Sequence, residues 1–93
     1  MITIKTNHGK ILIELHEESA PISCENFRSY ILDNYYNDTI FHRIIPNFMI
    51  QGGGFDADMI AKKTRSPIKN EADNGKKNIK GSISMARTSE IDS

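Results

Sequence analysis

The stretch from Phe41 to Gly54, FHRIIPNFMIQGGG, constrains the fold more than any other part of this chain. It holds two short runs of β-forming residues, Phe41–Ile45 and Phe48–Gln51, on either side of a proline turn. This pattern predicts an antiparallel hairpin, because proline and asparagine favour turns whereas branched and aromatic residues favour strands. The three glycines that follow lack the spacing of a phosphate-binding loop, and we expect close backbone packing or a sharp bend there.

The length of the turn decides which side chains share a face of this hairpin. A two-residue turn places Arg43 and Gln51 on opposite faces, whereas a three-residue turn over 46–48 pairs them across the strands. The second register gathers four residues on one face: Arg43, Ile45, Met49 and Gln51. We favour it, because it leaves Ile44 and Ile50 together on the other face for the core.

The first third of the chain predicts a second hairpin followed by a helix. Apolar residues alternate over Ile2–Thr6 and Lys10–His16, and Gly9 suits the turn between them. Glu17–Asn34 predicts a helix with Ser19 as its N-cap. Its apolar stripe consists of four residues at helical spacing: Ala20, Cys24, Phe27 and Ile31.

The last third is polar and carries little periodicity. Asp56–Lys80 predicts a long connection, and Gly81–Ala86 predicts a short final strand with Ile83 and Met85 packed. The expected fold class is therefore mainly β with one or two helices, within a single domain over 1–93.

Composition excludes several functions. Lys and Arg (12) balance Asp and Glu (12), so the net charge of zero argues against nucleic acid or an acidic membrane surface as a partner. A single cysteine, Cys24, fits a reducing compartment, and we expect a cytoplasmic protein in which Cys24 is a small core residue. No apolar run is long enough to span a bilayer, the three histidines are scattered, and neither a cofactor nor a metal is expected.

Four stretches of the chain together resemble one known family. In order they read APISCENFRSY, FHRIIPNFMIQGG, IKNEADNG and GSISMAR. They are similar to the motifs of the cyclophilin family of peptidyl-prolyl cis-trans isomerases, of the short bacterial or organellar type. The resemblance runs from Met1 to about Thr88 and implies a cyclophilin-like antiparallel β-barrel.

The resemblance also implies the site residues. Arg43 matches the catalytic arginine that stabilises a twisted prolyl amide, and Gln51 matches the glutamine that supports it and contacts the substrate backbone. Four further residues are implied in substrate binding: Phe48, Met49, Ala86 and Arg87. Phe48 and Met49 match the proline pocket, and Arg87 stands where many relatives have asparagine. The implied partners are proline-containing peptides and unfolded proteins, with cyclosporin-type ligands as a further class.

The chain departs from the family in its extent. Cyclophilin domains are considerably longer, and their next strand, beginning Gln-Phe-Phe, is absent here. We therefore expect an incomplete barrel, truncated on its C-terminal side. Three interpretations stay open. The chain is a fragment or truncated product of a cyclophilin whose function belongs to the full domain, which we favour; it is a degenerate binder of proline peptides with little turnover; or it assembles with another chain that supplies the missing half.

Overall fold

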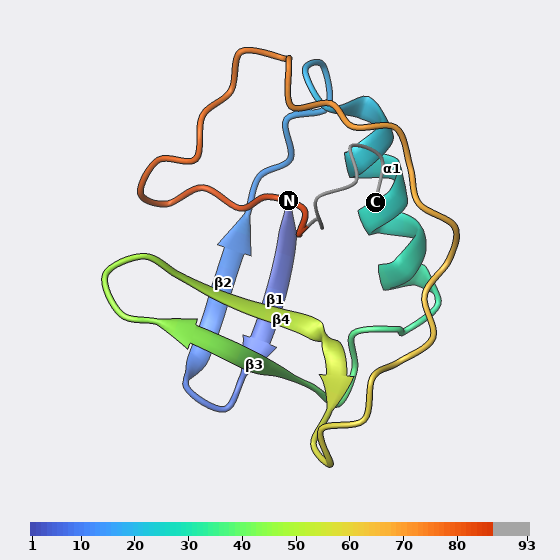
Figure 1. Ribbon diagram of the computed structural model, residues 1–93, viewed down its shortest axis with the longest axis vertical. Coiled ribbons are helices and arrows are strands. Elements are labelled where there is room, and N and C mark those ends of the chain that lie inside the picture. The colour runs from blue at the N-terminus through green and yellow to red at the C-terminus, as the bar shows by residue number, and fades with distance from the viewer. Residues whose placement is uncertain (87–93) are drawn as a thin grey trace.

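The computed structural model describes residues 1–86, and these form two hairpins and one helix (Figure 1). The elements are β1 (Ile2–Thr6), β2 (Gly9–Ile13), α1 (Pro21–Leu32), β3 (Thr39–Ile45) and β4 (Met49–Asp56). β1 pairs only with β2 and β3 only with β4, so no closed barrel exists within the described residues. The expectation of a mainly β fold with a helix and an incomplete barrel is confirmed, whereas the strand expected at Gly81–Ala86 is wrong.

The first hairpin follows from its alternating sequence. Ile2 pairs with Ile13 and Ile4 with Ile11, which gathers four branched side chains on one face. The turn closes at Gly9, whose φ of +119° suits glycine, as predicted. Only Ile13 of this face is fully buried, at 5% exposure.

α1 is shorter than predicted at both ends. Pro21 occupies the first turn, where its missing N–H costs nothing, but Ala20 and not Ser19 is the N-cap residue, and it offers no capping side chain. At the other end Asn34 takes a φ of 56°, and the Tyr35 N–H donates to the Tyr30 carbonyl at 3.0 Å. This is the left-handed stop that ends many helices.

An aromatic cluster joins the end of α1 to the start of β3. The Tyr30 and Tyr35 ring centroids lie 4.7 Å apart, and Tyr36 lies 5.4 Å from both Tyr35 and Phe27. The backbones of the helix and hairpins do not approach one another closely, and these ring contacts join α1 to the segment that leads into β3. The fully buried residues of the described chain are few: Ile13, Cys24 and Tyr30.

Residues 57–80, here called the strap, run from the end of β4 along the outside of α1 (Figure 1). The Lys62 N–H donates to the Gly54 carbonyl at 2.8 Å, which fixes the beginning of the strap to β4. Arg65 forms an ion pair with Asp33 at the C-terminal end of α1. The sequence predicted a connection here but not its attachment to the helix.

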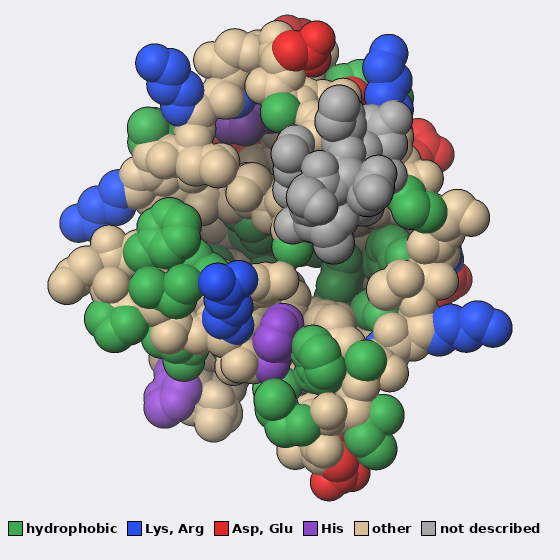
Figure 2. All heavy atoms as spheres, in the orientation of Figure 1, with side chains coloured by type: hydrophobic (Ala, Val, Ile, Leu, Met, Phe, Trp, Pro, Cys, Tyr) green, Lys and Arg blue, Asp and Glu red, His purple; other side chains and the backbone are tan. Residues whose placement is uncertain are grey.

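The surface carries separate charges and exposed apolar groups. Figure 2 shows Lys and Arg side chains standing apart from one another, with no single basic patch on the face drawn. Ile44 and Ile50 are 65% and 53% exposed, so the prediction that they form core is wrong. Ile83 and Met85, expected to pack, are also exposed. Within residues 1–86, no helix has the length and apolar character that crossing a membrane requires.

Candidate active site on the β3–β4 hairpin

The register of the second hairpin confirms the three-residue turn. Ile45 pairs with Met49 and Arg43 with Gln51. Asn47 takes a φ of 61°, a conformation that asparagine adopts more readily than most residues, and the Phe48 N–H donates to the Ile45 carbonyl at 3.1 Å. This hydrogen bond closes the three-residue turn, and the length of the turn determines which side chains share a face of the hairpin.

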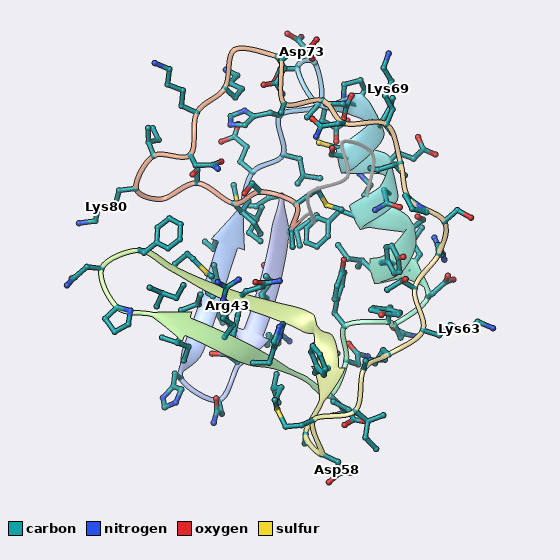
Figure 3. All side chains as sticks on the ribbon, viewed as in Figure 1. Arg43, Asp58, Lys63, Lys69, Asp73 and Lys80 are labelled. Carbon is teal, nitrogen blue, oxygen red and sulfur yellow. The ribbon has the colours of Figure 1, made fainter. Side chains whose placement is uncertain are left out.

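One face of the hairpin combines a cation, an amide and two apolar side chains. Arg43 is exposed, while Ile45, Met49 and Gln51 are half-buried. Among the described residues, no ion pair or hydrogen bond engages the Arg43 guanidinium. Figure 3 places Arg43 in the middle of the hairpin, away from the labelled lysines at the periphery. A guanidinium with five free donors beside apolar surface is suited to binding a carbonyl or amide group.

Phe48 lies at the tip of this face and is 77% exposed. An aromatic ring left in water beside a cation and a methionine offers an apolar surface to a ligand. Phe48 thus projects from the turn, in agreement with the three-residue register, and it does not line either of the two grooves described below.

Glycines at the far end of the hairpin allow very close backbone approaches. A Cβ on Gly52 would lie 2.7 Å from the Phe41 Cδ1 and 2.8 Å from the Ile40 carbonyl oxygen. Gly53 has a φ of +96°, and a Cβ there would meet the Tyr36 ring at 2.8 Å. The predicted close packing is confirmed, and it places the aromatic cluster next to the strand that carries Gln51.

His42 is a neighbour of Arg43 that the sequence did not single out. Its ring lies 4.4 Å from the Phe55 ring, and its Nδ1 is buried without a hydrogen-bond partner among residues 1–86. This contact joins β3 to the end of β4 next to the bulge between Phe41 and Arg43. No signal in the sequence marks it, because the two residues are thirteen positions apart in a region of shifted register.

The remaining predicted site residues are not brought to the hairpin by any described contact. Ala86 is exposed and lies outside any strand. Arg87 lies outside the described residues. The described part of the chain contains no cluster of His, Cys, Asp or Glu able to hold a metal ion.

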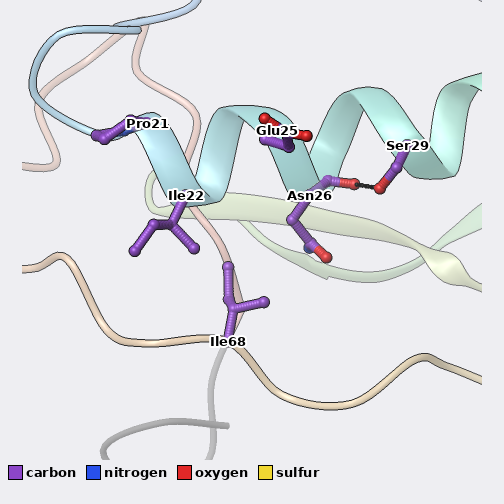
Figure 4. Close-up of a pocket in the computed structure, with 6 residues that line it drawn as sticks. All are labelled: Pro21, Ile22, Glu25, Asn26, Ser29 and Ile68. Carbon is purple, nitrogen blue, oxygen red and sulfur yellow. Dashed lines mark hydrogen bonds between the residues drawn. The ribbon is translucent and has the colours of Figure 1, made fainter.

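Two open grooves lie away from Arg43. The first runs between α1 and the strap, where Ile22 and Ile68 point toward each other (Figure 4). Its other lining residues are Pro21, Glu25, Asn26 and Ser29. The second lies between the first hairpin and the other side of α1, beside Leu15 and Ile31. Neither groove includes a residue predicted for the site.

Within the described residues, the β3–β4 hairpin thus presents an unpaired arginine, a cross-strand glutamine and an apolar tip on one surface. The family model described as cyclophilin type peptidyl-prolyl cis-trans isomerase/CLD matches residues 1–93. The chain belongs to the cyclophilin family, as its motifs predicted.

Several bacterial relatives are similar over nearly the whole chain. A peptidyl-prolyl cis-trans isomerase of Acinetobacter baylyi is 60% identical over 93 residues, which is 100% of this chain and 50% of that protein. Peptidyl-prolyl cis-trans isomerase A of Dickeya dadantii is 54% identical over 99% of this chain and 48% of that protein. Peptidyl-prolyl cis-trans isomerase B of Escherichia coli is 53% identical over 95% of this chain and 54% of that protein. The chain thus spans about half the length of these relatives.

Proposed function

We propose that the β3–β4 face binds Xaa-Pro peptide bonds and accelerates their cis-trans rotation. The observation that carries this proposal is the cross-strand pairing of Arg43 with Gln51 beside Met49. The names of the relatives, all peptidyl-prolyl cis-trans isomerases, support the same reaction. The substrates would be peptides and unfolded or flexible proteins that contain proline.

The chemistry requires no covalent step. Rotation about the prolyl amide is slow because the C–N bond has partial double-bond character, with a barrier of roughly 18–20 kcal/mol. At the top of this barrier resonance is lost and the nitrogen becomes pyramidal. A cationic donor that binds the twisted amide more tightly than the planar one lowers the barrier.

Each of the six predicted site residues has a role in the proposed reaction. The Arg43 guanidinium donates to the twisted amide, and Gln51 orients it or binds the substrate backbone. Phe48 and Met49 form the apolar surface for the proline ring. Ala86 lines the groove for the preceding residue, and Arg87 is a further binding residue. Cyclosporin-type ligands would compete with the peptide for this face.

We further propose that the protein is cytoplasmic, because its single thiol, Cys24, fits a reducing compartment.

Exchange spectroscopy on an Xaa-Pro peptide, without a coupled protease, tests this proposal. Arg43→Ala should lower the catalysed exchange rate by roughly 10²–10³-fold, the effect of deleting one stabilising donor. Lys10→Ala, at an exposed cation on the other hairpin, should change nothing and controls for the loss of a positive charge, whereas comparison with Arg43→Ala exposes any contaminating isomerase. Equal rates for the chain and its Arg43→Ala variant would exclude a catalytic role for Arg43.

A second candidate is a binder of proline peptides with little turnover. The exposure of Arg43 favours it, because a guanidinium in water interacts more weakly with an amide than one in a water-poor pocket. Saturable peptide binding that Arg43→Ala abolishes, without any acceleration of exchange, would establish this alternative.

A further inference from the structure

Glu71 supplies the hydrogen-bond acceptors that the start of α1 lacks. Its Oε1 accepts from the Ser23 N–H at 2.7 Å and its Oε2 from the Ile22 N–H at 3.2 Å. First-turn N–H groups have no partner within a helix, and the N-cap Ala20 offers none. A carboxylate also interacts favourably with the positive end of the helix dipole. Glu71 therefore caps a helix from about fifty residues further along the chain.

Further contacts hold the strap to both ends of the same helix. Near its start, the Asn74 side-chain amide donates to the Ser19 carbonyl at 3.0 Å. At its end, the Arg65 N–H donates to the Tyr30 hydroxyl at 2.8 Å, and the Arg65 guanidinium lies 4.8 Å from the centre of the Tyr30 ring. Within residues 75–86, the described hydrogen bonds are local or absent, so Asn74 is the last anchored point of the strap.

We propose that the strap opens and closes over α1 as a unit, and that the Glu71 carboxylate is the latch of its N-terminal attachment. At the N-terminal attachment the strap contributes the side chains of Glu71 and Asn74, whereas α1 and the residue before it contribute backbone groups. Without Glu71, the Ile22 and Ser23 N–H groups would be solvated by water. The strap would then be attached near the start of α1 only by the Asn74 hydrogen bond, which is neutral and therefore weaker than the bonds to the carboxylate. This device is independent of the isomerase reaction proposed above.

Cys24 lies where it can report the opening. It is 6% exposed, and burial followed by the negative charge of Glu71 raises the pKa of its thiol. Opening the latch moves the negative charge of Glu71 away from the thiol. This change increases the thiolate fraction, which is the reactive form.

Thiol–disulfide exchange with an aromatic disulfide reagent tests the proposal directly. Glu71→Ala should raise the Cys24 reaction rate roughly tenfold or more, since hydrogen bonds to a charged group are stronger than neutral ones, and Glu71→Gln should give a smaller increase. Glu25→Gln is the matched control, because this carboxylate lies on the same helix and makes no described hydrogen bond. Equal rates for the chain, Glu71→Ala and Glu25→Gln would overturn the proposal.

Amide hydrogen exchange distinguishes opening of the strap from general unfolding. In Glu71→Ala, the Ser23 and Arg65 amides should lose protection while the Ile45 amide, in the second hairpin, keeps it. A uniform loss of protection would show that Glu71 acts only on global stability, and the proposal would then be wrong.

Amide hydrogen exchange at low pH provides a second test of the latch. Burial tends to raise the pKa of Glu71, but the hydrogen bonds from Ser23 and Ile22, with the charge of Lys69, lower it overall. The folded pKa is below the ordinary value, so the latch is intact above that value and lost as pH falls through the folded pKa. After correction for the intrinsic pH dependence of amide exchange, the exchange rate of the Ser23 amide should therefore rise on acidification in the unsubstituted chain and stay constant in Glu71→Gln. Identical pH profiles for the two proteins would contradict the role of Glu71 as the latch.

Discussion

Arg43 on β3 lies directly opposite Gln51 on β4, so the guanidinium and the side-chain amide share one face of the hairpin. The guanidinium has no partner within the described chain, and its donors are therefore available to a ligand. The turn determines the register of the hairpin, and the register places Arg43 and Gln51 together for the proposed binding of a prolyl amide.

Gln51→Glu should remove this availability without harming the fold. A carboxylate opposite Arg43 would pair with the guanidinium and add about 0.2–1 kcal/mol to the stability of the hairpin. Peptide binding and catalysed exchange should fall because the donors are occupied. Thermal melting together with exchange spectroscopy measures both effects, and Asn7→Asp, in the turn of the other hairpin, controls for the added charge. Unchanged exchange in Gln51→Glu would show that the guanidinium does not act on the substrate.

The glycines of β4 should differ sharply in their tolerance of a methyl group. Gly52→Ala brings a Cβ into contact with backbone and ring atoms of β3, and we expect a loss of about 1–3 kcal/mol. At Gly54 nothing lies within 4 Å of an added Cβ, so Gly54→Ala should be neutral or stabilise by about 0.4–1 kcal/mol. Urea denaturation of both variants measures the difference. Equal stabilities would mean that β3 does not approach β4 as described.

Tyr30 and Tyr35 should respond in opposite ways to loss of their hydroxyls. The Tyr30 hydroxyl accepts from the Arg65 N–H at 2.8 Å, and Tyr30→Phe should cost about 1 kcal/mol. The Tyr35 hydroxyl is buried with no partner in the described chain, so Tyr35→Phe should be neutral or stabilising. Denaturation midpoints of the two variants provide the measurement, and a larger loss for Tyr35→Phe would contradict this arrangement of the cluster.

Alkaline pH should weaken the fold through Tyr36. Burial, with smaller contributions from Tyr30 and Tyr35, raises the pKa of Tyr36 from 10.0 to about 12. The unfolded chain therefore releases this proton at a lower pH than the folded chain, and the free energy of unfolding should fall as pH rises above 10. Denaturation between pH 8 and 11.5 measures the slope. Tyr36→Phe, which cannot ionise at this position, should make the slope shallower, with a remaining slope from Tyr35, whose pKa burial also raises. An equal slope in both proteins would exclude Tyr36 as a cause.

Local sequence signals predicted the parts of the fold that short-range geometry determines. The three-residue turn, the pairing of Arg43 with Gln51 and the close packing at Gly52 all follow from proline, asparagine and glycine at particular positions. These features depend on neighbouring residues, which the sequence lists directly.

Features that depend on residues far apart in the sequence could not be predicted from local patterns. Ser19 was expected to cap α1, but the acceptors come from Glu71, which only the path of the strap brings to the helix. Ile44 and Ile50 were expected in the core because they share an apolar face, yet burial requires another element to cover that face. A strand at 81–86 likewise requires a partner edge, and the described residues provide none.

Mapping of peptide binding by NMR shows directly whether the β3–β4 face binds proline-containing peptides. An Xaa-Pro peptide titrated into the labelled chain should shift the Met49 methyl and the Arg43 and Gln51 side-chain signals, while the same peptide with alanine in place of proline should shift them much less. This result would place proline recognition on the β3–β4 face. Shifts confined to Ile22 and Ile68, in the groove between α1 and the strap, would contradict the account and move the ligand to the other side of the molecule.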